Sequence, residues 1–157
     1  MGELLSASSG VPLLHVPYRG GGAPIQAVIG GEVDLLSDTL TVAMPHLQSG
    51  RPRALAVTSA EAWPTLPSVP PASATLSGFE VRSWLGLAAP AGAPEAIVQR
   101  LNHDTHAALA RKDVQQTLGH LGSMAWPGTP AAFKDMVAKE VVRWKDVIAR
   151  RGIQVEG

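Results

Sequence analysis

The spacing of apolar residues predicts a long helix near the C-terminus. From residue 130 to residue 151, apolar side chains return every three or four positions, which places them along one face of a helix. This face contains Phe133, Met136, Val137, Val141, Trp144, Val147 and Ile148. Thr129 precedes the run as a cap, and Pro130 suits the first helical position. Arg150 and Arg151 then add positive charge at the end, where the helix dipole favours it.

The same spacing predicts further helices, and short apolar runs between them predict strands. Helices are expected over residues 2–9, 24–29, 38–48, about 93–109 and 114–121. Strands are expected over residues 13–17, 33–36, 53–58 and 84–89. Because strands alternate with helices, the pattern predicts an α/β fold with a largely parallel sheet. Four prolines between residues 63 and 71 forbid regular structure there, so we expect an ordered surface loop over residues 63–78.

Composition narrows the possible classes of protein. The chain has 157 residues, of which 45% are hydrophobic, enough for one domain or two small lobes. Lys plus Arg and Asp plus Glu number 13 each, and the resulting net charge of zero argues against a nucleic-acid binder. The lack of cysteine excludes disulfides, thiolate metal sites and a cysteine nucleophile. The N-terminal stretch MGELLSASSG lacks the pattern of an export signal, so we expect none in the chain as written.

Residues 16–24, VPYRGGGAP, run from an apolar stretch into three glycines and a proline. Such a loop either makes a tight turn from strand to helix or lets a ligand approach the backbone closely. In the second case, backbone N–H groups at the start of the next helix would bind an anion. Both interpretations stay open, although the loop lacks the G-x-G-x-x-G and G-K-[ST] phosphate motifs. Tyr18 could line a pocket, and Arg19 could hold a ligand carboxylate.

Ligands of parallel α/β sheets bind beyond the carboxyl ends of the strands. This rule directs attention to the loops of residues 18–23, 37–39 and 59–61. Asp38 follows a predicted strand, and we favour a role for it as the N-cap of the next helix. If its carboxylate also faces a cleft, it would hold a ligand amine or organise water.

Other polar residues show no catalytic or metal-binding pattern. His103 and His106 lie three positions apart, which would supply half a zinc site, but no third ligand follows at a suitable spacing. No carboxylate pair and no Ser/His/Asp order indicates a catalytic centre. We therefore expect no metal, no cofactor and no enzymatic activity.

Several motifs follow one another along the chain in a characteristic order. They are VPYRGGGAP, GGEVDLLSDTL, SGRPRALAVTS, LPSVPP, and GFEVRSWLGLAAPAGAP with IVQRLN. Together they resemble the tripartite tricarboxylate transporter receptors, also called the TctC or Bug family of extracytoplasmic solute receptors. The resemblance extends from about residue 2 to residue 153. It implies a periplasmic location and a periplasmic binding protein-like II fold, in which two α/β lobes close around a small carboxylate.

By this resemblance the chain is an incomplete fold. Residues 1–83 would form a partial second lobe, and residues 84–157 a crossover strand with C-terminal helices that return to the first lobe. The family's signal peptide, the start of its first lobe and a glycine/serine loop of its second lobe have no counterpart here. The stretch PPASATLSG also lacks the acid that the family carries after its proline-rich loop.

The resemblance implies a receptor fragment that captures a small organic acid or an amino-acid carboxylate and delivers it to membrane permease subunits, with no nucleic-acid partner. The expected ligand-binding residues are Tyr18, Arg19, Gly20, Gly21, Asp38 and Thr39. Two alternatives stay open: a small α/β enzyme that uses residues 20–22 for an anionic substrate, and a non-functional truncated remnant. Because the last helix would lack part of its covering lobe, we also expect self-association or association with a separate first-lobe piece.

Overall fold

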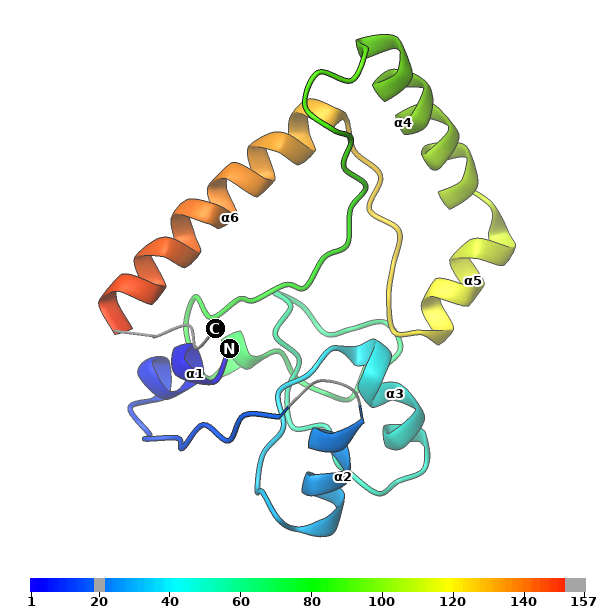
Figure 1. Cartoon of the computed structure of the whole chain (residues 1–157). Coiled ribbons are helices and arrows are strands. Elements are labelled where there is room, and N and C mark those ends of the chain that lie inside the picture. Colours follow the sequence, from blue (N-terminus) through cyan, green and yellow to red (C-terminus); the bar gives the residue numbers. More distant parts are fainter. Residues whose placement is uncertain (19–21, 152–157) are drawn as a thin grey trace. The chain divides into compact units, whose positions relative to one another are not determined.

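The computed structural model describes residues 1–18 and 22–151, and helices dominate this part of the chain (Figure 1). They are α1 (Gly2–Ser9), α2 (Ala23–Gly30), α3 (Leu40–Gln48), the 3-10 helix η1 (Ala72–Ala74), α4 (Glu95–Leu109), α5 (Lys112–His120) and α6 (Pro130–Arg151). Every α-helix expected from apolar spacing is confirmed, with ends that differ by a residue or two. The short helix η1 lies inside the region that we expected to be a loop.

None of the predicted strands is formed in the described residues. There, β-pairing is limited to one isolated parallel bridge between Val57 and Pro71. The N–H of Val57 donates to the carbonyl of Pro70 at 3.0 Å, and its carbonyl accepts from the N–H of Ala72 at 2.8 Å. A strand satisfies its backbone only through neighbouring strands, whereas a helix bonds to itself. The strand predictions are therefore wrong for this structure: the apolar runs are present without the partners that would make them a sheet.

The chain divides into two compact units. Unit 1 comprises Met1–Leu85 and Leu118–Ser123, and unit 2 comprises Gly86–Thr117 and Met124–Gly157. The assignment of residues 1–83 and 84–157 to two different lobes stays a prediction.

Unit 1 contains the buried hydrophobic side chains of the described chain. They come from α2, α3 and the region around the prolines: Ile25, Ala27, Met44, Val57, Val69, Ala72 and Phe79. Ile25 on α2 is the most deeply buried of them, with 1% of its surface exposed. This core joins segments that are distant in sequence, and it holds α2 and α3 within one unit.

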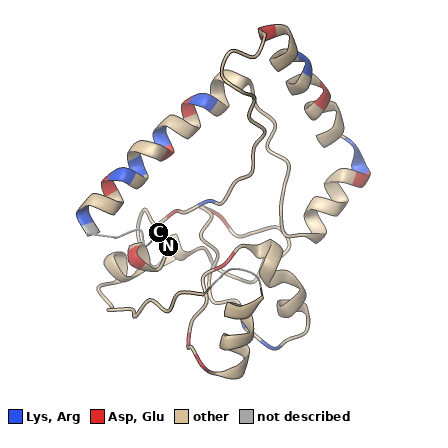
Figure 2. Cartoon of the chain, in the orientation of Figure 1, with Lys and Arg blue, Asp and Glu red and all other residues tan. Residues whose placement is uncertain are grey.

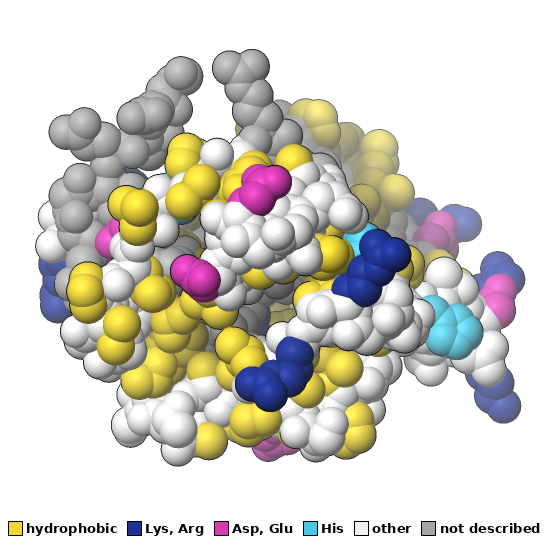
Figure 3. All heavy atoms as spheres, turned by 90° about the horizontal axis from the view of Figure 1, so that it is seen from below, with side chains coloured by type: hydrophobic (Ala, Val, Ile, Leu, Met, Phe, Trp, Pro, Cys, Tyr) yellow, Lys and Arg dark blue, Asp and Glu magenta, His cyan; other side chains and the backbone are white. Residues whose placement is uncertain are grey.

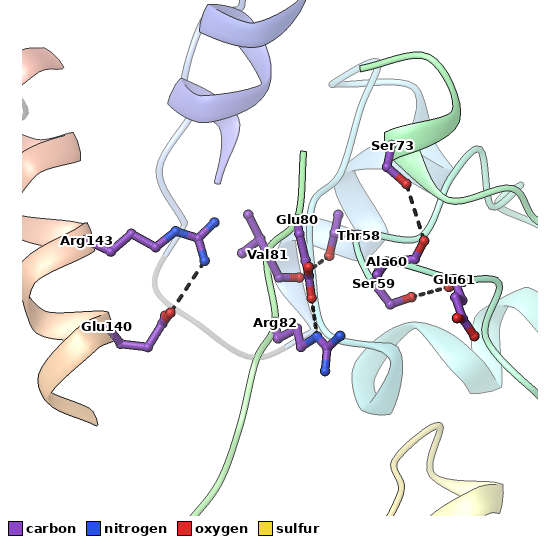
Figure 4. A network of polar contacts seen from close by, with 10 residues as sticks. All are labelled: Thr58, Ser59, Ala60, Glu61, Ser73, Glu80, Val81, Arg82, Glu140 and Arg143. Atoms are coloured by element: carbon purple, nitrogen blue, oxygen red, sulfur yellow. Dashed lines mark hydrogen bonds and ion pairs between the residues drawn. The ribbon is translucent and has the colours of Figure 1, made fainter. Parts of the chain in front are cut away.

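The proline-rich region is ordered mainly by hydrogen bonds. The segment after it returns to Thr58, whose carbonyl accepts from the N–H of Val81 at 2.9 Å. The Thr58 hydroxyl donates in turn to the Val81 carbonyl at 2.6 Å (Figure 4). The expected order of this region is confirmed, but its placement on the surface is only partly right. Val69 and Ala72 are buried, so the region contributes to the core.

Unit 2 has no buried side chain among its described residues. Helices α4 and α6 are linked through the carbonyl of Gly128, which lies just before α6. Asn102 Nδ2 donates to this carbonyl at 2.8 Å, and His106 Nε2 lies 2.9 Å from it. Gly86 is also constrained here, because a Cβ at this position would overlap the ring of Phe133. These contacts orient the helices without enclosing a core.

The apolar stripe predicted for α6 is only partly covered. Phe133, Val137 and Trp144 are half-buried, whereas Ile148 is 39% exposed. Basic and acidic residues are interspersed along the same helix (Figure 2). Glu140 accepts a hydrogen bond from Trp144 Nε1 at 2.8 Å, which holds the indole against its own helix. The helix is thus stabilised locally while part of its apolar face stays in contact with solvent.

We predict that Gly122→Ala destabilises unit 1. Gly122 has a φ of 68°, a conformation that costs a residue with a Cβ about 1–2 kcal/mol. The added Cβ would also lie 2.7 Å from the Cβ of Leu40 on α3, so α3 would have to shift. We expect the free energy of unfolding, measured in urea, to fall by roughly 2 kcal/mol or more.

Gly119→Ala is the matched control for this substitution. Gly119 lies in α5, and a Cβ there would meet no neighbouring atom within 4 Å. Because alanine favours a helix more than glycine does, this change should raise stability by up to about 1 kcal/mol. Equal losses at the two positions would contradict the packing of Gly122 against α3.

Candidate functional site

The candidate site consists of two loops of unit 1, each of which follows a run predicted as a strand. Tyr18 ends the described part of the first loop and is half-buried. Arg19, Gly20 and Gly21 lie outside the described residues. The ligand contacts expected from these three residues therefore stay a prediction.

The first loop leads directly into α2 through Gly22, the last of its three glycines. Gly22 is the N-cap of this helix, and a proline lies in its first turn. No described side chain caps this end, and the first turn carries no acidic residue. The helix itself is anchored by Ile25 and Ala27, which are buried in the core. An anion-binding loop is compatible with this arrangement, because it needs backbone amides without a competing carboxylate. A tight turn makes no such demand and is compatible with it as well.

In the second loop, Asp38 lies one residue before the N-cap of α3, whereas we expected Asp38 to be the N-cap itself. Helix α3 begins at Leu40, and Thr39 is its N-cap, with extended backbone angles of −75° and 149°. The Asp38 Oδ1 accepts a hydrogen bond from the N–H of Thr39 at 2.7 Å, and both residues are exposed. The prediction that Asp38 is the N-cap is therefore wrong, since its carboxylate binds the adjacent amide and not an amide inside the helix.

Thr39 caps α3 with its backbone. Its carbonyl accepts from the N–H groups of Val42 and Ala43 at 3.1 Å each, and its side chain makes no cap bond. At the start of α6, by contrast, the Thr129 Oγ1 accepts from the N–H of Ala132 at 3.1 Å. The exposed Thr39 hydroxyl is therefore not committed to its own helix.

The third loop considered from the sequence, residues 59–61, uses its hydroxyls internally. The Ser59 hydroxyl donates to the carbonyl of Glu61 at 2.7 Å, and the Ser73 hydroxyl donates to the carbonyl of Ala60 at 3.4 Å (Figure 4). The second bond could not be predicted from local sequence, because Ser73 and Ala60 lie 13 positions apart along a segment that includes the prolines. These bonds close the loop on itself and on η1, so we leave it out of the candidate site.

The two histidines of α4 have separate partners. His106 Nε2 lies near the carbonyl of Gly128, and His103 Nδ1 lies 3.2 Å from Asp104 Oδ1. The hydrogen bond from Arg100 holds the pKa of the Asp104 carboxyl below its usual value, and His103 adds to this effect. Within the described residues, no three His, Cys, Asp or Glu side chains gather in a way that could hold a metal ion. His103 thus contacts its own helix, and His106 contributes to the link between α4 and α6.

A shallow depression on α6 is lined by Ala138, Lys139, Val142 and Arg143, which all belong to that one helix. None of the described helices combines the length and the apolar character that crossing a bilayer requires.

The chain matches known sequences over most of its length. A sequence profile described as "Tripartite tricarboxylate transporter family receptor" matches residues 1–153. The "UPF0065 protein in tcbD-tcbE intergenic region" of Pseudomonas sp. (strain P51) is 40% identical over 147 residues, which cover 92% of this chain and 44% of that protein. The "UPF0065 protein in clcB-clcD intergenic region" of Pseudomonas knackmussii is 38% identical over 92% of this chain and 87% of that protein. The chain thus spans less than half of the first relative and most of the second.

Solved structures give the same result for the fold. The structure described as "R. palustris Rpa4515 with adipate" matches with a TM-score of 0.87 and 34% identity, over 97% of this chain and 51% of that one. "MatC (Rpa3494) from Rhodopseudomonas palustris with bound malate" matches with a TM-score of 0.79 and 37% identity, over 92% and 51%. The "periplasmic binding protein BugD" matches with a TM-score of 0.83 and 32% identity, over 99% and 53%.

The chain therefore spans about half the length of these solved proteins. The predicted fold class, an incomplete periplasmic binding protein-like II fold, is confirmed by these likenesses. The ligand contacts of the candidate loops stay a prediction.

We predict that the two threonine N-caps differ in what their hydroxyls contribute. Thr129→Ala removes the acceptor for the Ala132 N–H and should destabilise the start of α6 by about 1 kcal/mol. Thr39→Ala removes no cap bond and should change the stability of α3 by less than about 0.5 kcal/mol. Hydrogen exchange at the amides of Ala132 and Val42 reports on each helix separately. A loss at Thr39 as large as that at Thr129 would assign the Thr39 hydroxyl to its helix and remove it from the candidate site.

Proposed function

Because the chain belongs to the tripartite tricarboxylate transporter family of receptors, we propose that it forms part of the surface on which such a receptor binds a small carboxylate. One observation carries this proposal: two solved proteins that share its fold at more than 30% identity are described with adipate and with bound malate. Both compounds are small dicarboxylates. The activity that we assign is accordingly binding and not catalysis, since the family consists of receptors.

We assign ligand contact to the two loops of the candidate site. The residues concerned are Tyr18, Arg19, Gly20, Gly21, Asp38 and Thr39. An arginine guanidinium matches the two oxygens of a carboxylate in a forked pair of hydrogen bonds, which is the role proposed for Arg19. The exposed hydroxyl of Thr39, which makes no cap bond, supplies a further donor.

Asp38 requires a different role, because its carboxylate would repel a carboxylate placed directly beside it. Its exposed position suits a positively charged group or a water molecule. We propose that Asp38 holds the amine of an amino-acid ligand. On a dicarboxylate that lacks an amine, it would contribute no direct bond.

The proposed mechanism is closure of two lobes around the ligand. Binding would shift an existing equilibrium between open and closed forms towards the closed form. The loaded receptor would then deliver its ligand to the membrane permease subunits of a tripartite tricarboxylate-type transporter. We place this step in the periplasm, which the likeness to the periplasmic binding protein BugD supports.

Arg19→Ala should weaken the binding of a dicarboxylate. A suitable receptor for the test is a fusion in which residues 1–153 replace the matching half of the adipate-bound R. palustris protein. Hydrogen bonds to charged groups contribute about 1.5–3 kcal/mol, so the dissociation constant for adipate or malate should rise roughly 10- to 150-fold in calorimetry.

Arg51→Ala provides the matched control, because Arg51 is an exposed arginine of unit 1 outside the candidate loops. It should leave the affinity unchanged. The neutral diamide of adipic acid tests the charge of the ligand and should bind far more weakly than adipate. Equal effects of the two arginine substitutions, or equal affinities for acid and diamide, would contradict the proposed site.

Asp38→Asn tests the role assigned to the second loop. Asparagine keeps an oxygen that can accept from the Thr39 N–H and removes the negative charge. In the same fusion, the affinity for an amino-acid ligand should fall about tenfold or more, because a charged hydrogen bond is lost. Binding of adipate should be no weaker than before. Equal losses for both ligands in calorimetry would rule out an amine-holding role.

A further inference from the structure

Helix α6 has two faces, and its apolar stripe occupies only one of them. Successive helical residues are turned by about 100°, so Val142 lies about 180° around the helix from Phe133 and about 140° from Val137. Phe133 and Val137 are half-buried, whereas Val142 is 69% exposed. Val142 belongs to what we call the outer face of α6, which consists of Asp135, Ala138, Lys139, Val142, Asp146 and Arg150. The outer face is therefore a different surface from the stripe.

The charged residues of the outer face alternate in sign around Val142. Lys139 and Asp146 lie about one helical turn from Val142 on either side, and Asp135 and Arg150 lie about two turns from it. Spacings of three or four residues keep these side chains on one side of the helix, and all of them are exposed. Along the chain their order is acid, base, acid, base, with an exposed apolar residue at the centre.

This order of charges is complementary to itself when the helix is reversed. In an antiparallel pair of α6 helices with its two-fold axis beside Val142, Lys139 would lie opposite Asp146 of the second copy. Asp135 would lie opposite Arg150 of the second copy, and the two-fold axis repeats each pairing. The two Val142 side chains would meet at the centre. A parallel pair in register would instead place like charges together, which is unfavourable.

Part of this charge has no partner within its own chain. Neither Asp135 nor Lys139 forms a hydrogen bond or an ion pair with any described residue. Arg150 Nε donates to Asp146 Oδ1 at 2.7 Å, yet the two side chains stay 76% and 53% exposed. Because a carboxylate has two oxygens that accept hydrogen bonds, Asp146 can hold Arg150 and a second cation together. Arg143, at the border of the outer face, pairs with Glu140 of its own helix at 3.4 Å.

The regular order of charges distinguishes α6 from other parts of the surface. The face of the molecule in Figure 3 carries many hydrophobic side chains and few charged ones. Basic and acidic residues recur along α6 from one end to the other (Figure 2). Ala138 is also exposed on the outer face, beside Val142. Small side chains at a contact let two helix axes approach closely, so the outer face offers little steric hindrance to a second helix.

We propose that the outer face of α6 binds the same face of a second copy, in an antiparallel pair that makes the protein a two-fold dimer. The contact is limited to one helix of 22 residues in each copy, so the dimer is weak and forms at high protein concentration. The pairing leaves the stripe of Phe133 and Val137 uncovered and uses no residue of the candidate site. It therefore does not depend on the proposed function.

Charge reversal on the full 157-residue chain tests the pairing. Lys139→Glu would set two acids against each other across the contact, and Asp146→Lys would set two bases against each other. Each variant alone should weaken the dimer about tenfold or more in analytical ultracentrifugation, because like charges face each other twice. An equimolar mixture of the two variants should associate as strongly as the unchanged chain, since each pairing in the mixed dimer again joins an acid and a base.

Lys134→Glu is the matched control. It makes the same change of charge on an exposed lysine of α6 that lies about 140° around the helix from Lys139. This variant should leave the dimer unchanged. Raising the salt from about 0.05 M to about 0.5 M should weaken the dimer of the unchanged chain, because salt screens exposed charges.

A chain that stays monomeric at its highest soluble concentration would overturn the proposal. An association constant that Lys139→Glu leaves unchanged would do the same, because the contact would then lie elsewhere. Loss of the dimer in both single variants without recovery in their mixture would contradict the antiparallel order. Equal weakening by Lys134→Glu would assign the effect to net charge and not to the outer face.

Discussion

A β-strand cannot satisfy its own backbone hydrogen bonds, and this constraint separates what the chain forms from what it does not. Each α-helix closes its bonds within its own residues, so α1 to α6 need no distant partner. Residues 84–89 have the apolar side chains of a buried strand, yet their N–H and C=O groups need neighbours on both sides. In the described chain, such pairing is met at one place, between Val57 and Pro71.

The hydrophobic core follows from that pairing. The bridge at Val57 brings the proline-rich region beside residues 57–58, and the reciprocal bonds between Thr58 and Val81 hold the segment that follows. Val69 and Phe79 are buried in the same region, so backbone pairing and side-chain burial coincide. Unit 2 has no such pairing in its described residues, and it buries no side chain there. Helices alone therefore do not give this chain a core, because an apolar stripe needs a second surface to cover it.

The sequence predicted the features that local interactions decide. Apolar spacing and the Thr129 cap located α6, and the structure confirms both the helix and the cap bond. The start of α3 was harder, because Asp38 and Thr39 are both good N-cap residues. The choice between them depends on where the helix begins, which the burial of Met44 against distant segments helps to set. The candidate loops were located as the ends of apolar runs, but which of their side chains meet depends on the sheet that orders those runs. No local pattern encodes that arrangement.

The proposed site depends on the same constraint. Tyr18 and Asp38 follow two runs that were predicted as strands, and the distance between two such loops is fixed only where the runs pair in one sheet. A ligand that binds one arrangement of the loops loses apparent affinity in proportion to how rarely that arrangement is populated. Strand pairing would raise that population and therefore the affinity for the ligand. Because such coupling is reciprocal, the ligand would strengthen the pairing by the same factor.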